Sequence, residues 1–306
     1  MLGIALLTGA LELFYYLPAA DKAALSVQEL TYFVPFGWLI RNLHFWAAQF
    51  SLIFALIHLL RVILTGAYAA HRSFNYLLGL TLSVILLFWD FSGYVLRWDA
   101  GIQWALIVGV NLLKSIPLVG ESLYFALVGG AQIGEATLLR FYAWHIFGLT
   151  LLAGIFLVWH IFRIRRDGGV ALPPRNLRAA SERITRDELV RREILAMLFS
   201  GVMLLLVAIF FPAPIAAPIR EVTAISGEAR APWFFLWIQE MLTWGDPFFW
   251  GIFLPTLFLT IFALLPYLFP QPAPQEWGRW FPRGNRFAQA VSAALLLFIL
   301  VLSLLK

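Results

Sequence analysis

The sequence has 306 residues, of which 61% are hydrophobic and only 13% charged, and its mean hydropathy is +0.83. This balance excludes an ordinary soluble globular domain. The net charge is +5, but the basic residues gather in particular loops, which argues against a nucleic-acid partner. The chain has no cysteine, so disulfides, thiolate metal sites and iron–sulfur clusters within it are excluded.

Seven stretches carry almost no charge over about 17 to 25 residues, the length at which a helix crosses roughly 30 Å of hydrocarbon. They are 1–18, 43–61, 75–97, 138–162, 193–212, 249–270 and 287–305. Lipid offers no partner for open backbone groups, so the sequence predicts an all-α integral membrane bundle with about seven transmembrane helices. The first stretch has no basic leader and no small-residue cleavage site, which disfavours a signal peptide.

The segments between these stretches predict two modules. The loop 98–137 contains apolar pieces that we expect to be interfacial helices, and 213–248 is a proline-rich loop. A polar, arginine-rich connection with Pro173 and Pro174 at its centre follows the fourth stretch. We therefore expect an N-terminal four-helix domain at 1–168, a basic cytoplasmic linker at 169–192 and a three-helix domain at 193–306.

The basic residues also predict the orientation of the chain. With residue 1 on the cytoplasmic side, that side collects 14 of the 22 lysines and arginines. Since cytoplasmic loops are enriched in these residues, we expect a multi-pass protein of the inner (cytoplasmic) membrane with a cytoplasmic N-terminus.

Four of the five histidines lie in two apolar stretches, His44 with His58 and His145 with His160. At 100° per residue, a spacing of 14 leaves about −40° and a spacing of 15 about +60°, so each pair stays roughly on one helix face. The members of each pair are about 21 to 23 Å apart along the helix axis. Both stretches run in the same direction across the membrane, so His44 comes level with His145, and His58 with His160.

Matched pairs of intramembrane histidines favour haem ligation. The alternative is that the histidines only form hydrogen bonds inside the bundle. An ionisable group in hydrocarbon is costly unless it is employed, and a neutral imidazole is the commonest axial haem ligand. A proton relay or a zinc site would need the residues within one coordination sphere. The pattern predicts two bis-histidine haem b groups stacked through the membrane.

Other residues near the histidines fit large planar cofactors. Gly79 and Gly93 are also 14 residues apart, and a residue without a Cβ lets a macrocycle edge approach the backbone, although helix packing is the alternative role. Arg41 and Arg61 each lie three residues from a histidine at the membrane boundary. There a guanidinium can pair with haem propionates, or simply anchor the helix.

Longer motifs surround these residues: VPFGWLIRNLH at 34–44, GYVLRWD at 93–99 and GGAQIGEATLLRFYAWH at 129–145. In them the chain closely resembles the cytochrome b family of quinol-oxidising cytochrome bc complexes, over nearly its whole length. Residues from about 193 onward resemble a separate three-helix subunit of some branches, here fused to the four-helix part. The resemblance implies that His44 and His145 hold an outer haem, and His58 and His160 an inner one.

The resemblance also implies a Q cycle. Quinol is oxidised near the outer haem, one electron goes to a Rieske iron–sulfur protein, and the other crosses both haems to an inner quinone site. The expected partner proteins are a Rieske iron–sulfur protein, c-type cytochrome subunits or both. The expected surroundings are the lipid bilayer and a homodimer or larger respiratory or photosynthetic complex. His71 and Arg72 are candidates for the inner quinone site, with a solvated turn as the alternative.

The chain departs from the family at the outer site. Where the family usually has Pro-Glu-Trp-Tyr, this chain has Ala231, Pro232, Trp233 and Phe234, so the carboxylate is missing. Where the family usually has Pro-Trp-Asp, residues 97–99 are RWD. The first stretch keeps Gly9 at the position of one haem-facing glycine of the family. It lacks the preceding segment, in which the family has a second haem-facing glycine.

Because quinol oxidation releases protons, the missing carboxylate calls for a substitute. We expect Glu240 first and Asp90 next, with Tyr94 beside them, and Glu12 as a further candidate. The alternative roles are an interfacial charge for Glu240 and helix–helix hydrogen bonds for Asp90 and Glu12. The altered motif also leaves a second function open, a di-haem membrane anchor that conducts electrons to the quinone pool without bifurcation.

Overall fold

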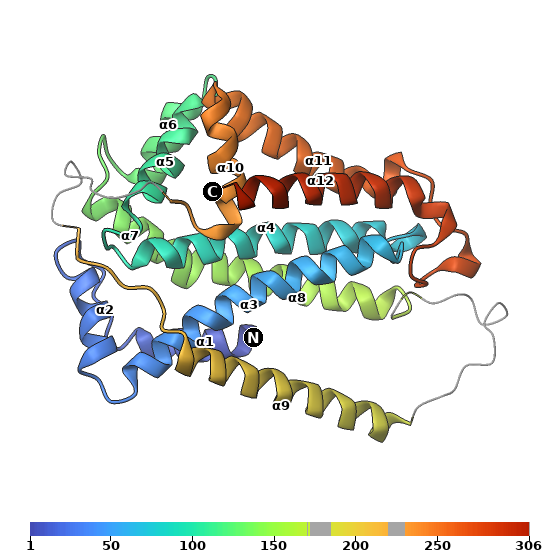
Figure 1. The fold of residues 1–306 in the computed structure, drawn as a ribbon, viewed down its shortest axis with the longest axis horizontal. Coiled ribbons are helices and arrows are strands. Elements are labelled where there is room, and N and C mark those ends of the chain that lie inside the picture. The colour runs from blue at the N-terminus through green and yellow to red at the C-terminus, as the bar shows by residue number, and fades with distance from the viewer. Residues whose placement is uncertain (170, 172–184, 220–229, 306) are drawn as a thin grey trace.

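The computed structural model describes residues 1–169, 171, 185–219 and 230–305, and these fold almost wholly into helices (Figure 1). In chain order the helices are α1 (Leu2–Glu12), α2 (Ala23–Tyr32), α3 (Gly37–Leu64), α4 (Ser73–Leu96), α5 (Gln103–Leu112), α6 (Gly120–Val128), α7 (Glu135–Ala143), α8 (Leu149–Arg166), α9 (Arg186–Phe210), α10 (Leu236–Met241), α11 (Leu254–Leu268) and α12 (Arg286–Leu304). The expected all-α fold is confirmed.

Within the described ranges, six helical segments are long and apolar enough to cross a membrane: Gly37–Leu64, Ala70–Leu96, Glu135–Arg166, Arg186–Phe210, Phe248–Leu268 and Arg283–Leu304. Six of the about seven expected spans are found among the described residues, and the first stretch forms instead the shorter apolar helix α1, which has 11 residues. At 1.5 Å per residue that is about half the thickness of the hydrocarbon core. The apolar run at 1–18 is interrupted by turns after Glu12, which its composition alone did not reveal.

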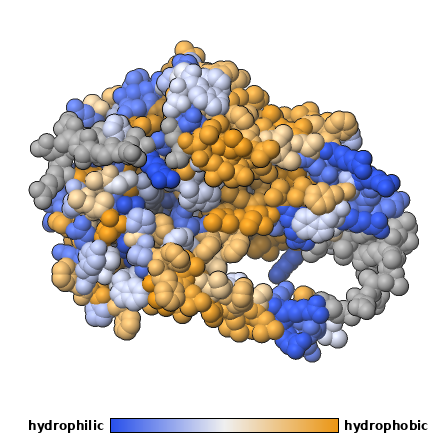
Figure 2. Space-filling model, in the orientation of Figure 1, coloured by the Kyte–Doolittle hydropathy of each residue, from blue (hydrophilic) through white to orange (hydrophobic). Residues whose placement is uncertain are grey.

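The long helices lie side by side along the molecule (Figure 1). Helices α3, α4 and α8 form the centre, and α1 packs along α3. Helix α11 packs against α4, and α12 packs against α3 and α11. Helix α9 contacts α3 at its C-terminal half, where Leu204 and Ala208 are buried. Apolar side chains cover the middle of the molecule and hydrophilic ones gather towards its ends, as a membrane-spanning bundle requires (Figure 2).

Helix α9 begins earlier than the sequence suggested. Thr185 caps it by accepting a hydrogen bond from the backbone N–H of Glu188, so the last part of the expected 169–192 linker is helical. Most of the remaining linker, at 170 and 172–184, lies outside the described residues, as do 220–229 of the proline-rich loop. The division of the chain into two domains stays a prediction.

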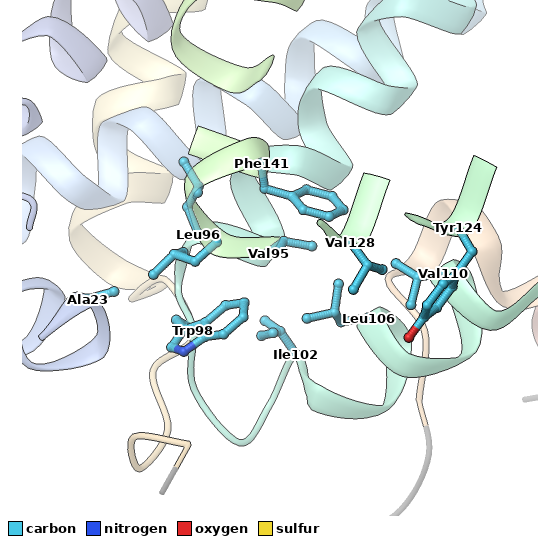
Figure 3. Packing of buried hydrophobic residues seen from close by; sticks show 11 residues of the cluster. Ala23, Val95, Leu96, Trp98, Ile102, Leu106, Val110, Tyr124, Val128 and Phe141 are labelled. Atoms are coloured by element: carbon cyan, nitrogen blue, oxygen red, sulfur yellow. The ribbon is translucent and has the colours of Figure 1, made fainter. Parts of the chain in front are cut away.

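The loop 98–137 does contain two short helices, α5 and α6, which build a core at one end of the bundle (Figure 3). Buried side chains from these helices, from α4 and from α7 meet there, and the largest include Trp98, Ile102, Leu106 and Phe141. This core holds the loop against the end of α4, next to the functional site described below.

Asn42 ties the two halves of the chain together. Its buried side-chain amide donates to the carbonyl oxygen of Ala208 at 2.8 Å, and its oxygen accepts from the backbone N–H of Ala213 at 2.9 Å. We expect Asn42→Ala to lower the free energy of unfolding by about 1–3 kcal/mol, because two buried backbone groups lose their partner. Thermal unfolding in detergent measures this.

The matched control is Asn111→Ala. Asn111 only donates to the carbonyl of Ile107 on its own helix, so its loss should leave the melting temperature within a degree or two of the parent. Equal melting temperatures for both variants would contradict a docking role for Asn42.

Candidate functional site

Two histidines from different helices face each other near one end of the bundle. The imidazole rings of His44 on α3 and His145 between α7 and α8 have centroids 6.3 Å apart and planes at 78°. Two metal–imidazole bonds of about 2 Å each, plus about half a ring on either side, add to roughly 6 Å. One metal ion between the rings therefore fits without moving the backbone.

The histidine side chains are held in a common way. In three of them Nδ1 lies at hydrogen-bond distance from a backbone carbonyl oxygen: His44 from Ala5 at 2.9 Å, His145 from Trp89 at 3.1 Å and His160 from Asn75 at 3.1 Å. A carbonyl accepts only, so Nδ1 carries the proton and Nε2 is left as a metal ligand. Orientation of this kind is typical of histidines that bind metals.

A glycine accompanies each of these bonds. A Cβ placed on Gly9 would lie 2.8 Å from Cε1 of His44, one on Gly93 would lie 2.7 Å from Cε1 of His145, and one on Gly79 would lie 3.1 Å from Cε1 of His160. In each case the carbonyl that holds the ring belongs to the residue four before the glycine. The missing side chain lets the ring approach the helix closely enough to reach that carbonyl.

His145 lies in a wide π turn, Trp144–Gly148, that joins α7 to α8 in one continuous span. Its carbonyl oxygen accepts from the Trp89 indole N–H at 3.0 Å and from the Thr150 hydroxyl at 2.8 Å. A π turn absorbs one extra residue. The spacing of 15 between His145 and His160 therefore becomes equivalent in phase to the spacing of 14 between His44 and His58.

The second pair lies towards the other end of the same helices. His160 is held by α4 as described, and His58 is its electrostatic neighbour on α3. His58 is exposed in this chain, and Arg61 lies close enough to interact with it electrostatically. At the adjoining turn, His71 and Arg72 both contact the carbonyl oxygen of Asp167, so these two residues join α4 to the end of α8.

A cavity of about 510 Å³ opens around the first pair. Its wall includes the ligand candidates His44 and His145 and their glycines, and its volume lies within the 300–1,000 Å³ typical of sites for organic ligands. Among the residues that the structure describes, no group of three or more His, Cys, Asp or Glu side chains is placed to hold a metal ion. A metal between two histidines would therefore take its other ligands from a macrocycle, which the cavity and the glycines accommodate.

The structure places the expected arginines differently. Arg41 lines the cavity. Its guanidinium donates hydrogen bonds to the carbonyl oxygens of Ala213 and Pro214, so some of its N–H groups are bonded to the segment that follows α9. Arg61 is exposed at the far end of α3. Both keep donors for a carboxylate, since a guanidinium has five N–H groups.

Arg97, in place of the family's usual proline, pairs with Asp99 at 2.7 Å. Asp99 in turn accepts from the backbone N–H of Ala216 at 3.0 Å, and its backbone pairs with Pro218. The altered RWD motif thus fixes the connection after α9 over the C-terminal end of α4.

Of the expected outer-site residues, Asp90, Tyr94 and Glu12 line the cavity. Tyr94 donates to the carbonyl oxygen of Gly101 at 2.8 Å, and one carboxylate oxygen of Glu12 is buried without a hydrogen-bond partner. Glu240 lies on α10 and is not part of the cavity wall. Pro232, Trp233 and Phe234 do line it, so the altered motif reaches the site even though Glu240 does not.

Sequence reasoning missed Gln49. It lies on the cavity wall with its side chain between Asp90 and Trp233. A search for uncharged polar residues within the apolar stretches would have found it.

These features define a class, a multi-pass helical membrane protein with paired histidines that suit a porphyrin. Residues 1–168 match the family described as Cytochrome b/b6/petB, and the chain belongs to that family. It is therefore a membrane electron-transport protein, and membership of the family implies haem b.

Curated relatives support the assignment. Over 161 residues the chain is 37% identical to "Cytochrome b6" of Porphyra purpurea, which covers 53% of this chain and 75% of that protein. It is 38% identical over 165 residues to "Cytochrome b6" of Cyanidium caldarium, covering 54% and 77%. A solved structure titled "Hyperthermophilic respiratory Complex III" superposes with a TM-score of 0.74 at 18% identity, covering 99% of this chain and 89% of that one, which extends the shared fold to the C-terminal helices.

Proposed function

We propose that the chain binds two haem b groups and passes electrons through them across the bilayer, between an outer quinol site and an inner quinone site. His44 and His145 hold the outer haem, and His58 and His160 the inner one. The observation that carries the proposal is the 6.3 Å separation of the His44 and His145 rings, with the Nδ1 of each at hydrogen-bond distance from a carbonyl.

A bound haem supplies a one-electron carrier at each site. The protein's own part is to fix the imidazoles, to exclude water and to set the distance between the two sites. Fourteen residues of α3 separate the two ligands that it provides, which is about 21 Å along the helix. The two haems would therefore span most of the hydrocarbon core.

Further support comes from charge and from the relatives. The basic residues of 163–192 and of the turn before α12 favour the cytoplasmic side for the His58 and His160 end, in an inner (cytoplasmic) membrane. The expected cytoplasmic N-terminus depended on a spanning first stretch and does not follow from six spans. The structural similarity to a chain of a respiratory complex is consistent with partners such as a Rieske iron–sulfur protein or a c-type cytochrome, in a homodimer or larger assembly.

The test of this function is quinol-driven reduction in the purified intact complex. Addition of a quinol should reduce the b haems, and subsequent addition of an oxidant for the high-potential partner should transiently increase that reduction. The increase arises because bifurcation sends the second electron to the haems only when the first electron leaves. Absence of any quinol-driven haem reduction would contradict the proposal.

A second candidate is a di-haem anchor that conducts electrons without bifurcation. It is favoured by Pro232, which stands where the family usually has a carboxylate. For this function, quinol or another donor reduces the haems, but the oxidant then only oxidises them. The sign of the oxidant-induced change separates the two functions.

A further inference from the structure

A continuous hydrogen-bonded series crosses the wall of the outer cavity. The side-chain nitrogen of Gln49 on α3 lies 2.9 Å and 3.0 Å from the two carboxylate oxygens of Asp90 on α4. The indole N–H of Trp233 donates to the side-chain oxygen of Gln49 at 2.7 Å. Residues from three segments far apart in the sequence thus meet at the segment that replaces the usual quinol-site motif.

The polarity of this series is fixed by chemistry. An indole N–H only donates, so the oxygen of the Gln49 amide must face Trp233 and its NH₂ must face Asp90. Gln49 can therefore only donate to Asp90. A donor of this kind stabilises the ionised form of a carboxyl group, which is the form that accepts a proton.

Asp90 is isolated from other charges. Asp90 and Gln49 are each only 9% exposed to solvent. Asp90 takes part in none of the ion pairs formed by the described residues. A carboxylate in a membrane interior without a cation is costly, so residues of this kind usually serve proton transfer or a ligand. Asp90 also lines the cavity, whose wall contains Gln49 and Tyr94 as well.

We propose that Asp90 is the group that accepts the proton of a hydroquinone hydroxyl in the outer cavity, with Gln49 and Trp233 as its positioning residues. This inference rests on the proposed function. Oxidation of the hydroquinone to the quinone breaks two O–H bonds. Asp90 accepts the first proton on a carboxylate oxygen, releases it towards the outer surface and is then free to accept the second proton. The two electrons leave one at a time, one to the iron–sulfur or c-type partner and one to the outer haem.

The alternative acids fit less well. Glu240 lies outside the cavity wall. Glu12 lines it, but from α1, near Arg41 and His44, while Asp90 is linked through Gln49 to the Pro232–Trp233 segment itself. The carboxyl function lost at Pro232 is thus supplied from α4 and connected back to the neighbouring tryptophan.

The first experiment is stopped-flow reduction of the purified complex by decylhydroquinone, with haem content and dithionite-reduced spectra recorded for each variant. Asp90→Asn keeps the shape and the bond from Gln49 but cannot accept the proton. Its rate should fall by about 10²- to 10⁴-fold with both haems retained. Asp21→Asn, an exposed acid before α2, is the matched control and should react at the parent rate.

The second experiment identifies the group without a variant. Infrared difference spectra of the parent complex, recorded during quinol oxidation, should show a protonated carboxyl band that shifts on carbon-13 labelling of aspartate and not of glutamate. Gln49→Leu and Trp233→Phe should move this band and slow the reaction by about 3- to 10-fold, with haem spectra unchanged. If Gln49 and Trp233 had only a structural role, these substitutions would change the reaction rate without shifting the carboxyl band.

The outcomes separate the two proposals. If quinol does not reduce the haems of the parent, the proposed function fails and Asp90 loses its role with it. If the parent reacts and Asp90→Asn stays within about twofold of it, or the large loss appears in Glu240→Gln or Glu12→Gln instead, the function stands and the assignment of Asp90 is overturned. Should Asp90→Asn not assemble, the labelling decides: a band that follows aspartate supports the assignment, and a glutamate band or none overturns it.

Discussion

Replacement of His160 by leucine is expected to halve the haem content of the purified protein and leave the outer haem in place. The two sites share the helices α3 and α8 but share no ligand, and the carbonyl of Asn75 that holds His160 is remote from the carbonyls that hold His44 and His145. Loss of one axial ligand removes the inner haem, while the outer cavity keeps its walls. Pyridine haemochrome analysis, normalised to polypeptide, measures the change.

The matched control is His71→Leu, which removes the one histidine outside the two pairs. Its Nε2 contacts the carbonyl of Asp167 in a turn, so the variant should keep the full haem content. A folded, inserted His160→Leu protein with parental haem content would show that His160 is not a ligand.

The second large effect is expected at Gly93. The Cβ of a valine there would lie 2.7 Å from Cε1 of His145, which is too close, and the ring cannot move away without losing its contacts with the Trp89 carbonyl and the Ser92 hydroxyl. We expect Gly93→Val to lose the outer haem and quinol-driven reduction, and to keep the inner haem. A redox titration followed optically would show one b-type component instead of two.

Gly154→Val serves as the control for helix propensity. It lies on α8 between the two histidines, and a Cβ there meets nothing within 4 Å, so the substitution tests only the change from glycine to valine. Both titration components should persist in this variant. Loss of the same component from Gly154→Val would mean that the Gly93 effect is not steric.

The site could be predicted from the sequence to the extent that it depends on helical periodicity. Four histidines in apolar stretches determine two levels in the bundle, because the rise and rotation per residue are nearly constant along a helix. On a regular helix the spacing of 15 between His145 and His160 leaves an offset of about +60°. The π turn at Trp144–Gly148, which absorbs the extra residue, has no clear signature in the sequence.

What escaped the sequence depends on tertiary contacts. Asp90 and Trp233 are 143 positions apart in numbering, and only the fold brings them to opposite sides of the Gln49 amide. Arg41 was expected to face the cofactor, but the carbonyls of Ala213 and Pro214 compete for its donors. The length of α1 depends on where its turns fall, and mean hydropathy carries no information about turns.

The most direct test of the whole account is the number and ligation of the haems in the purified parent protein. The account predicts two haem b per polypeptide, both low-spin in the electron paramagnetic resonance and near-infrared magnetic circular dichroism spectra expected for two imidazole ligands. It also predicts two separate midpoint potentials in an optical titration. A single haem per polypeptide, or a high-spin five-coordinate haem at the site of His44 and His145, would contradict it.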